Sequence, residues 1–161
     1  MPRLETLSEV QRNMLQMFPC IEHDDAPRTP MRKPLSESRV ALVTSAGLHL
    51  RGDKPFISDT RGKGDSSYRV LPRCTPASEI IQSHTSIGFD HTGIYRDINV
   101  TYPIDRLEEL REQGVIGSLA DNYYSFMGAI RDVTELATET GPEVARRMFD
   151  EGVDVVFLTP T

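Results

Sequence analysis

Two short, uninterrupted apolar runs constrain the fold of this chain more than any other feature of its sequence. Val40–Thr44 is the first run, and Val153–Leu158 is the second, directly after a helical pattern that opens at Pro142 and stops at Gly152. Apolar runs of this length are typical of strands buried on both faces, and a helix–Gly–strand unit is typical of crossovers between parallel strands. The pattern predicts an α/β fold, a three-layer, Rossmann-like sandwich with a mostly parallel sheet.

Weaker patterns supply the other elements. Apolar residues at helical spacing predict a helix that ends near Pro19 and another over Ile104–Leu110. Extended segments are expected at Tyr68–Leu71, at Ile80 and Ile81, and over Asp97–Tyr102. A charged, Pro-rich stretch follows the first helix, so we interpret residues 1–38 as a helix with an extended connection and residues 39–161 as one globular α/β domain.

Composition narrows the class of partner. The 161 residues include 18 Lys plus Arg against 24 Asp plus Glu, a formal net charge of −6, and an acidic chain repels nucleic-acid phosphates. The N-terminus lacks the apolar core of a signal peptide, and no segment approaches the roughly 20 apolar residues of a membrane span. We therefore expect a cytoplasmic protein that binds neither nucleic acid nor membrane, with Cys20 and Cys74 as free thiols.

The densest group of reactive side chains lies just past the predicted strand at Ile80 and Ile81. Open α/β sheets bind ligands beyond the carboxyl ends of their strands. Imidazoles transfer protons near neutral pH, and a neighbouring carboxylate orients them. The residues expected to act catalytically are His84, Asp90, His91 and Asp97.

A second group of polar residues is expected to bind a small anionic substrate. Some of these residues follow the first apolar strand, where Gly47 would let the backbone approach a ligand, and others belong to the His-rich stretch. A guanidinium recognises a carboxylate through two parallel hydrogen bonds. The expected substrate-binding residues are Ser45, His49, Arg51, Ser83, Arg96 and Asn99.

Other readings of the same residues stay open. Asp, Ser and Thr side chains often satisfy only the backbone of an irregular loop. His84 and His91 with Asp90 or Asp97 would suit zinc or iron, which would make the protein a metal-dependent lyase or hydrolase. The spacing matches no strong metal signature, so no metal is expected, and a serine hydrolase lacks its Gly-x-Ser-x-Gly elbow.

Four segments of the chain together carry a resemblance to a known family: Val40–His49, Gly64–Arg69, Asp97–Leu107 and Glu151–Pro160. They resemble the selenoprotein B family, the B component of the glycine, sarcosine, betaine and D-proline reductases. The similarity is closest to the short form typified by the D-proline reductase B subunit, and it extends from about Pro34 onward. The run from His84 to Leu107 is its most specific part.

The resemblance implies a reductase subunit that cleaves a C–N bond next to a carboxylate in a small amino-acid-like substrate. The electron-rich centre of such an enzyme is a selenocysteine or a low-pKa cysteine. The family works with a partner subunit, which in several members carries a pyruvoyl group. A homo- or hetero-oligomer is therefore expected.

The chain departs from this family at the redox residue. The resemblance implies a cysteine or selenocysteine just after Thr161, and neither Cys20 nor Cys74 lies at that position. We expect a chain that is incomplete at its C-terminus relative to the family, carries no cofactor and is inactive alone. Two explanations stay open: a selenocysteine codon read as a stop, or a naturally short, non-catalytic relative that binds ligands or acts as a scaffold.

Overall fold

The computed structural model describes residues 3–17, 24, 29–57, 64–84 and 91–161. They form two compact units, Met1–Pro30 and Met31–Thr161, each described by itself. The first unit holds η1 (Leu4–Thr6) and α1 (Glu9–Gln16). Ser8 and Gln11 form a capping box, in which each side chain accepts the other's backbone N–H and so satisfies the start of α1. The predicted N-terminal helix is confirmed, with its α-helical part beginning at Glu9.

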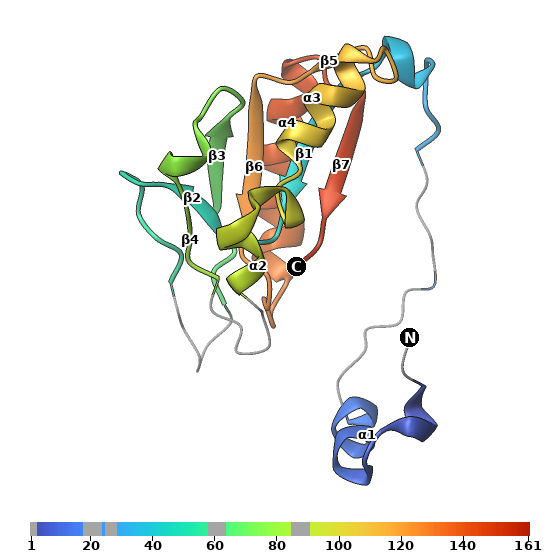
Figure 1. Ribbon diagram of the computed structural model, residues 1–161, viewed down its shortest axis with the longest axis vertical. Helices are drawn as coiled ribbons and strands as arrows, with labels where there is room; N and C mark the ends of the chain where they lie inside the picture. The colour runs from blue at the N-terminus through green and yellow to red at the C-terminus, as the bar shows by residue number, and fades with distance from the viewer. Residues whose placement is uncertain (1–2, 18–23, 25–28, 58–63, 85–90) are drawn as a thin grey trace. The chain divides into compact units, whose positions relative to one another are not determined.

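The larger unit is built on a mostly parallel sheet (Figure 1). Its strands are β1 (Arg39–Thr44), β3 (Tyr68–Pro72), β5 (Ser118–Leu119), β6 (Asn122–Phe126) and β7 (Val155–Thr159). Strand β1 is central, because β7 pairs in parallel along one of its edges and β5 and β6 pair in parallel along the other. Strand β3 is antiparallel to β6, and β2 (Leu48–Leu50) and β4 (Ile80–Gln82) form a small antiparallel sheet. The predicted α/β class and mostly parallel sheet are confirmed.

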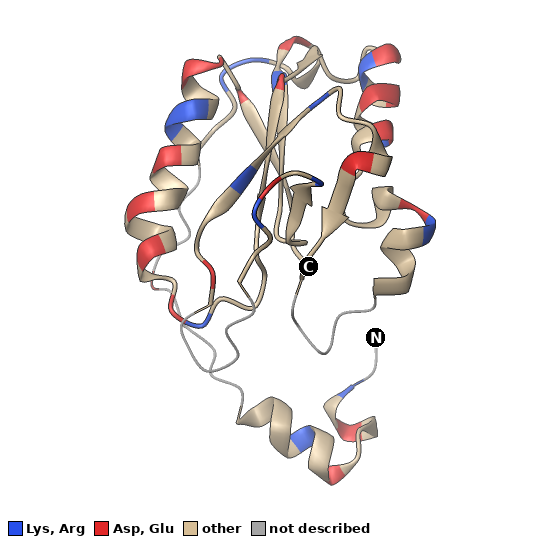
Figure 2. Cartoon of the chain, turned by 90° about the vertical axis from the view of Figure 1, so that its left-hand side faces the viewer, with Lys and Arg blue, Asp and Glu red and all other residues tan. Residues whose placement is uncertain are grey.

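Helices lie on both sides of this sheet. In the views of Figures 1 and 2, α4 lies on one side and α2 and α3 lie on the other, with charged residues along the helices. The helical segments are η2 (Leu35–Glu37), η3 (Ala77–Glu79), α2 (His91–Arg96), η4 (Ile98–Val100), α3 (Ile104–Glu112), η5 (Leu136–Thr140) and α4 (Gly141–Asp150). Within the described part of the chain, no helix combines the length and the apolar character needed to cross a membrane.

The finer expectation of a Rossmann-like sandwich stays a prediction. A doubly wound fold joins neighbouring parallel strands by crossover helices. Here β1 is followed by the short strand β2, and the next strand of the main sheet, β3, is antiparallel. The first half of the unit therefore departs from that winding, whereas the α4–β7 unit follows it.

One expected strand is wrong. The segment Asp97–Tyr102 is not extended but contains the 3-10 helix η4. The Asp97 side chain accepts hydrogen bonds from the backbone N–H of Asn99 and from its Nδ2, at 2.9 and 2.8 Å. Such a local bond offers the backbone a turn in place of a sheet ladder. Its stabilisation outweighs the β-propensity of Ile98, Val100 and Thr101.

The core packs both faces of the sheet against the helices. Val40, Ala41 and Leu42 of β1 are almost fully buried, as are Tyr123 and Tyr124 of β6. The buried residues that the helices contribute are Ile94 from α2, Leu107 from α3, and Val144 and Met148 from α4. The apolar face of each of these helices therefore lies against the sheet, as expected for amphipathic helices.

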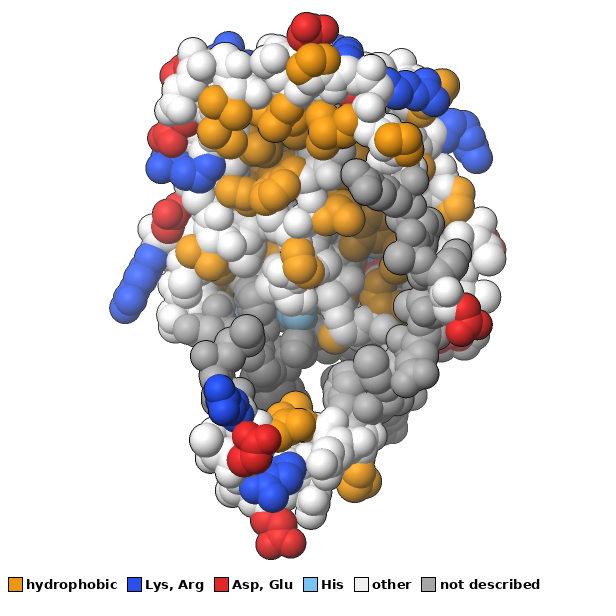
Figure 3. All heavy atoms as spheres, turned by 90° about the vertical axis from the view of Figure 1, so that its right-hand side faces the viewer, with side chains coloured by type: hydrophobic (Ala, Val, Ile, Leu, Met, Phe, Trp, Pro, Cys, Tyr) orange, Lys and Arg blue, Asp and Glu red, His pale blue; other side chains and the backbone are white. Residues whose placement is uncertain are grey.

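Strand β7 differs from the strand expected at its position. Its apolar run predicts burial on both faces, but Val156, Phe157 and Leu158 are 37%, 46% and 66% exposed. Figure 3 looks at this side of the molecule and shows hydrophobic side chains gathered on it. The expectation of a buried strand is therefore wrong: among the residues that the structure describes, β1 pairs with one edge of β7 and no strand pairs with the other.

Candidate functional site

The carboxyl ends of three parallel strands converge on His84. Strand β1 leads to Ser45, β6 leads to Gly128, and β7 leads to Thr161. The backbone N–H of Thr161 donates to Ser45 Oγ at 2.8 Å. A Cβ atom added to Gly128 would lie 2.5 Å from His84 Nε2 and 2.7 Å from the Thr161 carbonyl oxygen. Only glycine lets this strand end approach the imidazole so closely.

A second close approach fixes the backbone of His84. Gly47, in the turn from β1 to β2, has a φ of 65°. A Cβ atom there would lie 3.1 Å from both Cα and N of His84. Next to it, Ser83 donates its backbone N–H to the Gly47 carbonyl at 2.9 Å, and its Oγ accepts the N–H of Phe56 at 3.1 Å. The position of His84 therefore depends on the turn that follows β1.

His84 is a buried imidazole that stays neutral at physiological pH. His84 is 6% exposed to solvent. Burial lowers the pKa of His84, and the charge of His91 nearby lowers it further. Because a buried cation loses its hydration and is repelled by a second cation, the uncharged form is favoured. A neutral imidazole can accept a proton, which is what a general base requires.

Gln82 fixes the tautomer of His91. The Gln82 Nε2 group donates to the Ala46 carbonyl at 3.2 Å, which turns its Oε1 toward His91 Nδ1 at 2.9 Å. An amide oxygen only accepts, so Nδ1 of His91 donates and carries the proton. In neutral His91 the Nε2 atom therefore holds the lone pair. The two imidazoles, His84 and His91, are thereby linked to the end of β4.

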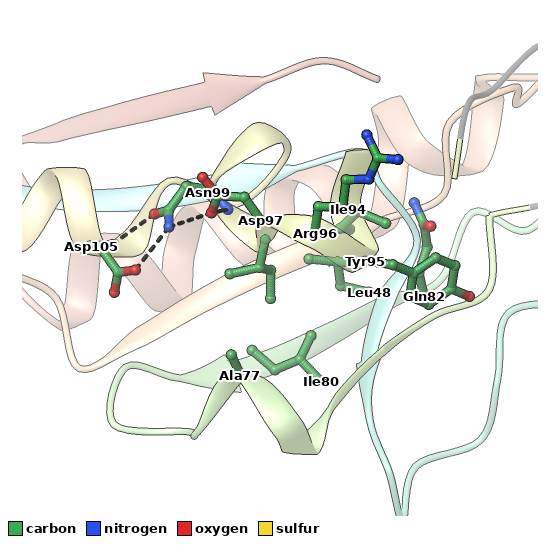
Figure 4. Close-up of a pocket in the computed structure, with 11 residues that line it drawn as sticks. Leu48, Ala77, Ile80, Gln82, Ile94, Tyr95, Arg96, Asp97, Asn99 and Asp105 are labelled. Carbon is green, nitrogen blue, oxygen red and sulfur yellow. Dashed lines mark hydrogen bonds between the residues drawn. The ribbon is translucent and has the colours of Figure 1, made fainter. Parts of the chain in front are cut away.

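A cavity of about 370 Å³ extends from Gln82 along α2 and η4 (Figure 4). Leu48, Ile80 and Ile94 give it apolar walls. In Figure 4, Arg96 and Gln82 lie toward one end, and a hydrogen-bonded group of Asp97, Asn99 and Asp105 lies toward the other. The remaining lining residues are Ala77, Tyr95 and Ile98. The residues that line the cavity therefore include one arginine and two aspartates.

Asp97 and Asn99 also hold the loop between α2 and α3. Asn99 Nδ2 donates to Asp97 and to Asp105, each at 2.8 Å, while its Oδ1 accepts the backbone N–H of Asp105 at 3.0 Å. The side-chain and backbone hydrogen bonds from Asn99 lower the pKa of Asp97. Asp97 is therefore ionised at neutral pH. Its hydrogen bonds cap η4, which is a structural role beside the catalytic role that the sequence predicts.

Two other candidates are not among the described residues that line the cavity. His49 is buried in β2, where its Nδ1 donates to the Leu50 carbonyl at 2.7 Å. Arg51 is exposed and donates to the Ser78 carbonyl at 2.9 Å, with its Nε 3.6 Å from Glu79. Asp90 lies outside the described residues. The structure thus brings together Ser45, Ser83, His84 and His91 at the strand ends, and Arg96, Asp97 and Asn99 along the cavity.

Sequence reasoning missed Gln82 and Gly128. Gln82 ends a short strand directly before the Ser83-His84 pair, so its nearness in sequence was a usable signal. Gly128 directly follows the segment Tyr123–Met127, whose composition fits either a helix or a strand. Glycine after such a segment marks a strand end, but only the fold shows that this end meets His84.

No group of three His, Cys, Asp or Glu suited to a metal ion is present among the described residues. Asp90, a suggested metal ligand, lies outside them, as does Cys20. Cys74 is an exposed free thiol.

Comparison with known proteins identifies the family. The glycine/sarcosine/betaine reductase selenoprotein B family matches residues 11–161, which is nearly the whole chain. The chain belongs to the selenoprotein B family. The predicted resemblance is therefore confirmed. No solved structure matches the chain.

Similar members of the selenoprotein B family are named as reductase subunits. The chain is 41% identical over 131 residues to D-proline reductase subunit gamma of Acetoanaerobium sticklandii, covering 81% of this chain and 52% of that protein. It is 30% identical over 149 residues to glycine reductase complex component B subunit gamma of Carboxydothermus hydrogenoformans, covering 92% and 34%. It is 28% identical over 146 residues to sarcosine reductase complex component B subunit beta of Peptoclostridium acidaminophilum, covering 89% and 33%. The chain thus spans between a third and a half of the length of these relatives.

Proposed function

We propose that the chain is a component of a reductase that cleaves a C–N bond in a small amino-acid-like substrate, together with a partner reductase subunit. The observation that carries the proposal is the convergence of three parallel strand ends on His84, in a chain of the selenoprotein B family. Open α/β sheets place ligands at this edge. The full Rossmann-like sandwich is part of the same proposal, with β7 as an inner strand.

His84 and His91 handle protons in this proposal. Reductive cleavage of a C–N bond places two electrons and a proton on carbon, while the departing amine takes up a proton. Neutral His84, next to the backbone of Thr161 and Gly128, holds or accepts a proton at Nε2. His91, whose Nδ1 proton is directed at Gln82, presents the lone pair of its Nε2.

Arg96 binds the carboxylate of the substrate. It lines the cavity that Gln82 connects to the two imidazoles, and its guanidinium can form two parallel hydrogen bonds to a carboxylate. Asp97 and Asp105 line the same cavity, and a substrate ammonium would be attracted to their charge. An amino acid carries both charges, so it suits a cavity with a cation and carboxylates in its wall.

The redox residue follows Thr161 in this proposal. The backbones of Ser45, Gly128 and Thr161 meet beside His84, so a residue placed after Thr161 starts next to a neutral imidazole. A selenolate or thiolate there attacks the carbon and displaces the amine, which leaves with a proton. One thiol of a dithiol outside this chain then attacks the selenium or sulfur of the adduct, so that the carbon leaves with the electron pair and is protonated, and the second thiol releases the selenolate or thiolate as the dithiol becomes a disulfide. A pyruvoyl group on the partner subunit would activate the substrate amine.

The test compares the 161-residue chain with one extended by a cysteine or selenocysteine directly after Thr161. Each is combined with the partner subunit and a dithiol, and product is measured from glycine, sarcosine, betaine and D-proline. We expect turnover of one of these substrates by the extended chain and none by the short chain. Turnover by the 161-residue chain would overturn the proposed place of the redox residue.

Arg96 and Arg51 provide a matched pair within that assay. Arg96→Gln removes the guanidinium that lines the cavity, so KM should rise about 10- to 100-fold, as for the loss of a charged hydrogen bond. Arg51→Gln changes an equally exposed arginine whose partners are Ser78 and Glu79, and KM should stay unchanged. If KM rises for Arg51→Gln and stays unchanged for Arg96→Gln, the substrate carboxylate binds Arg51 and the proposed role of Arg96 is wrong.

A further inference from the structure

The open edge of β7 is an interaction surface. Strand β7 pairs with β1 over Val40↔Val155 to Thr44↔Thr159. Among the described residues, no strand pairs with the other edge of β7. A strand edge without a partner presents a row of backbone N–H and C=O groups that can pair with a further strand.

The side chains of β7 have the composition of an inner strand. Phe157, which lies on the same strand face as Thr159, is 46% exposed, and Leu158 on the opposite face is 66% exposed. Thr159 Oγ1 donates to the carbonyl of Thr101 at 2.9 Å, so the first of these faces is the side that carries η4. Parallel strands with apolar residues on both faces are normally covered on both. Here both faces are only partly covered.

Strand β7 also lacks the charges by which natural proteins protect an edge. Its five residues, Val-Val-Phe-Leu-Thr, include no charged side chain. The nearest carboxylate, Asp154, accepts the N–H of Arg39 at 2.8 Å and pairs with Lys33 at 2.7 Å, so it belongs to the start of β1. An exposed apolar edge of this kind favours association with another polypeptide segment.

The relatives are longer than the region that matches this chain. The matched region makes up 52% of D-proline reductase subunit gamma and 34% of the glycine reductase subunit gamma. About half or more of each relative therefore lies outside the region that folds as described here. We propose that this other part of the family polypeptide adds a strand to the open edge of β7 and covers Phe157 and Leu158.

Hydrogen exchange in the intact relative tests the proposal without dissecting the protein. The strand of D-proline reductase subunit gamma that aligns with Val155–Thr159 should be protected along both edges. In the 161-residue chain alone, the amides that point away from β1 should exchange about 100-fold faster or more, since they open without unfolding the sheet. Fast exchange of the same amides in the intact relative would overturn the proposal.

Co-expression tests the surface on this chain itself. The tagged 161-residue chain is co-expressed with the unmatched part of subunit gamma, and we expect the two to purify together and the β7 amides to become protected. Leu158→Lys should reduce the co-purified amount at least tenfold, whereas Val133→Lys, a control at a 41% exposed valine outside β7, should not. If the unmatched part of subunit gamma fails to fold when it is co-expressed, hydrogen exchange in the intact relative decides whether the proposal holds.

A second copy of the chain is the alternative occupant. In sedimentation experiments on the purified chain, we expect no dimer that depends on Phe157. The check is Phe157→Lys, which would dissociate such a dimer. A dimer with that behaviour would assign the edge to self-association and would overturn the proposal.

Discussion

Strands β1 and β7 lie side by side and have nearly the same kind of sequence, but their burial is very different. In register, Ala41 pairs with Val156 and Leu42 pairs with Phe157. The β1 residue of each pair is fully buried, whereas Val156 and Phe157 are 37% and 46% exposed. The difference arises from position, because β1 has strands on both edges, whereas in the described part of the chain β7 has only β1 beside it.

The comparison teaches that a continuous apolar run indicates a strand suited to burial on both faces. Strand β1 reaches such burial within this chain, whereas in our proposal β7 reaches it only with a further segment. At their carboxyl ends the two strands become alike again, because Ser45 and Thr161 meet beside His84. Two properties can be tested separately: the different burial of β1 and β7 along their lengths, and the meeting of their carboxyl ends beside His84.

The largest expected effect separates a buried leucine from an exposed one. Leu42→Ala should lower the free energy of unfolding by about 2–5 kcal/mol, because it leaves a cavity between well-packed neighbours. Leu158→Ala should cost about 0.5 kcal/mol or less in the chain alone, as for exposed positions. Urea unfolding of both variants measures the difference, and equal losses would remove the distinction between the strands.

The next effect concerns the point where the strand ends meet. Gly128→Ala should lower stability by about 1–3 kcal/mol, because the added Cβ overlaps His84 Nε2 and the Thr161 carbonyl. It should also shift the NMR signals of the His84 ring. Gly52→Ala is the matched control, since a Cβ there meets no atom within 4 Å. An unchanged His84 signal in Gly128→Ala would place the imidazole elsewhere.

A smaller effect compares one threonine from each strand. Both Thr44 Oγ1 and Thr159 Oγ1 donate to the carbonyl of Thr101 at 2.9 Å. Thr44 is buried and also accepts the N–H of Ala46, so Thr44→Val should cost about 1–2 kcal/mol. Thr159→Val should cost less, because water reaches its partly exposed site. Thermal unfolding ranks the two, and a larger loss for Thr159→Val would contradict the account.

The smallest effect is a pH dependence from His84. Its pKa in the folded chain lies below the ordinary value of 6.5, so the unfolded chain binds more protons between the two values. The stabilisation is complete above pH 6.5 and is lost as the pH falls toward the folded pKa. The melting temperature should therefore drop between pH 7.5 and pH 5.5, and His84→Gln should reduce that drop. A drop of the same size in the variant would assign the effect to other groups.

Much of the fold could be predicted from short, strong patterns. The runs that became β1 and β7 and the helix from Pro142 depend on local periodicity, and the sequence displays it directly. Asp97–Tyr102 could not be predicted, because hydrogen bonds from Asn99 outweigh a strand-like composition. The exposure of β7 could not be predicted either, since burial depends on which elements lie beside a strand and not on the strand's own residues.

The candidate site could be predicted in part. Histidines close together after a strand indicated the region of His84 and His91, because strand ends bind ligands. The role of Gly128 is a long-range property, since it comes from a segment more than 40 positions later in the chain. Neither local composition nor spacing reports which strand ends will meet.

The most direct test of the strand-end site adds one cysteine after Thr161 in a Cys20→Ser, Cys74→Ser chain. If the carboxyl ends of β1, β6 and β7 converge on His84, the new thiol starts beside that neutral imidazole, which can accept the thiol proton and so favours the thiolate. Alkylation by iodoacetamide at pH 7 should then be about tenfold faster than in the same chain with His84→Gln. Equal rates in the two proteins would show that a residue after Thr161 does not reach His84, and the proposed reaction centre would be wrong.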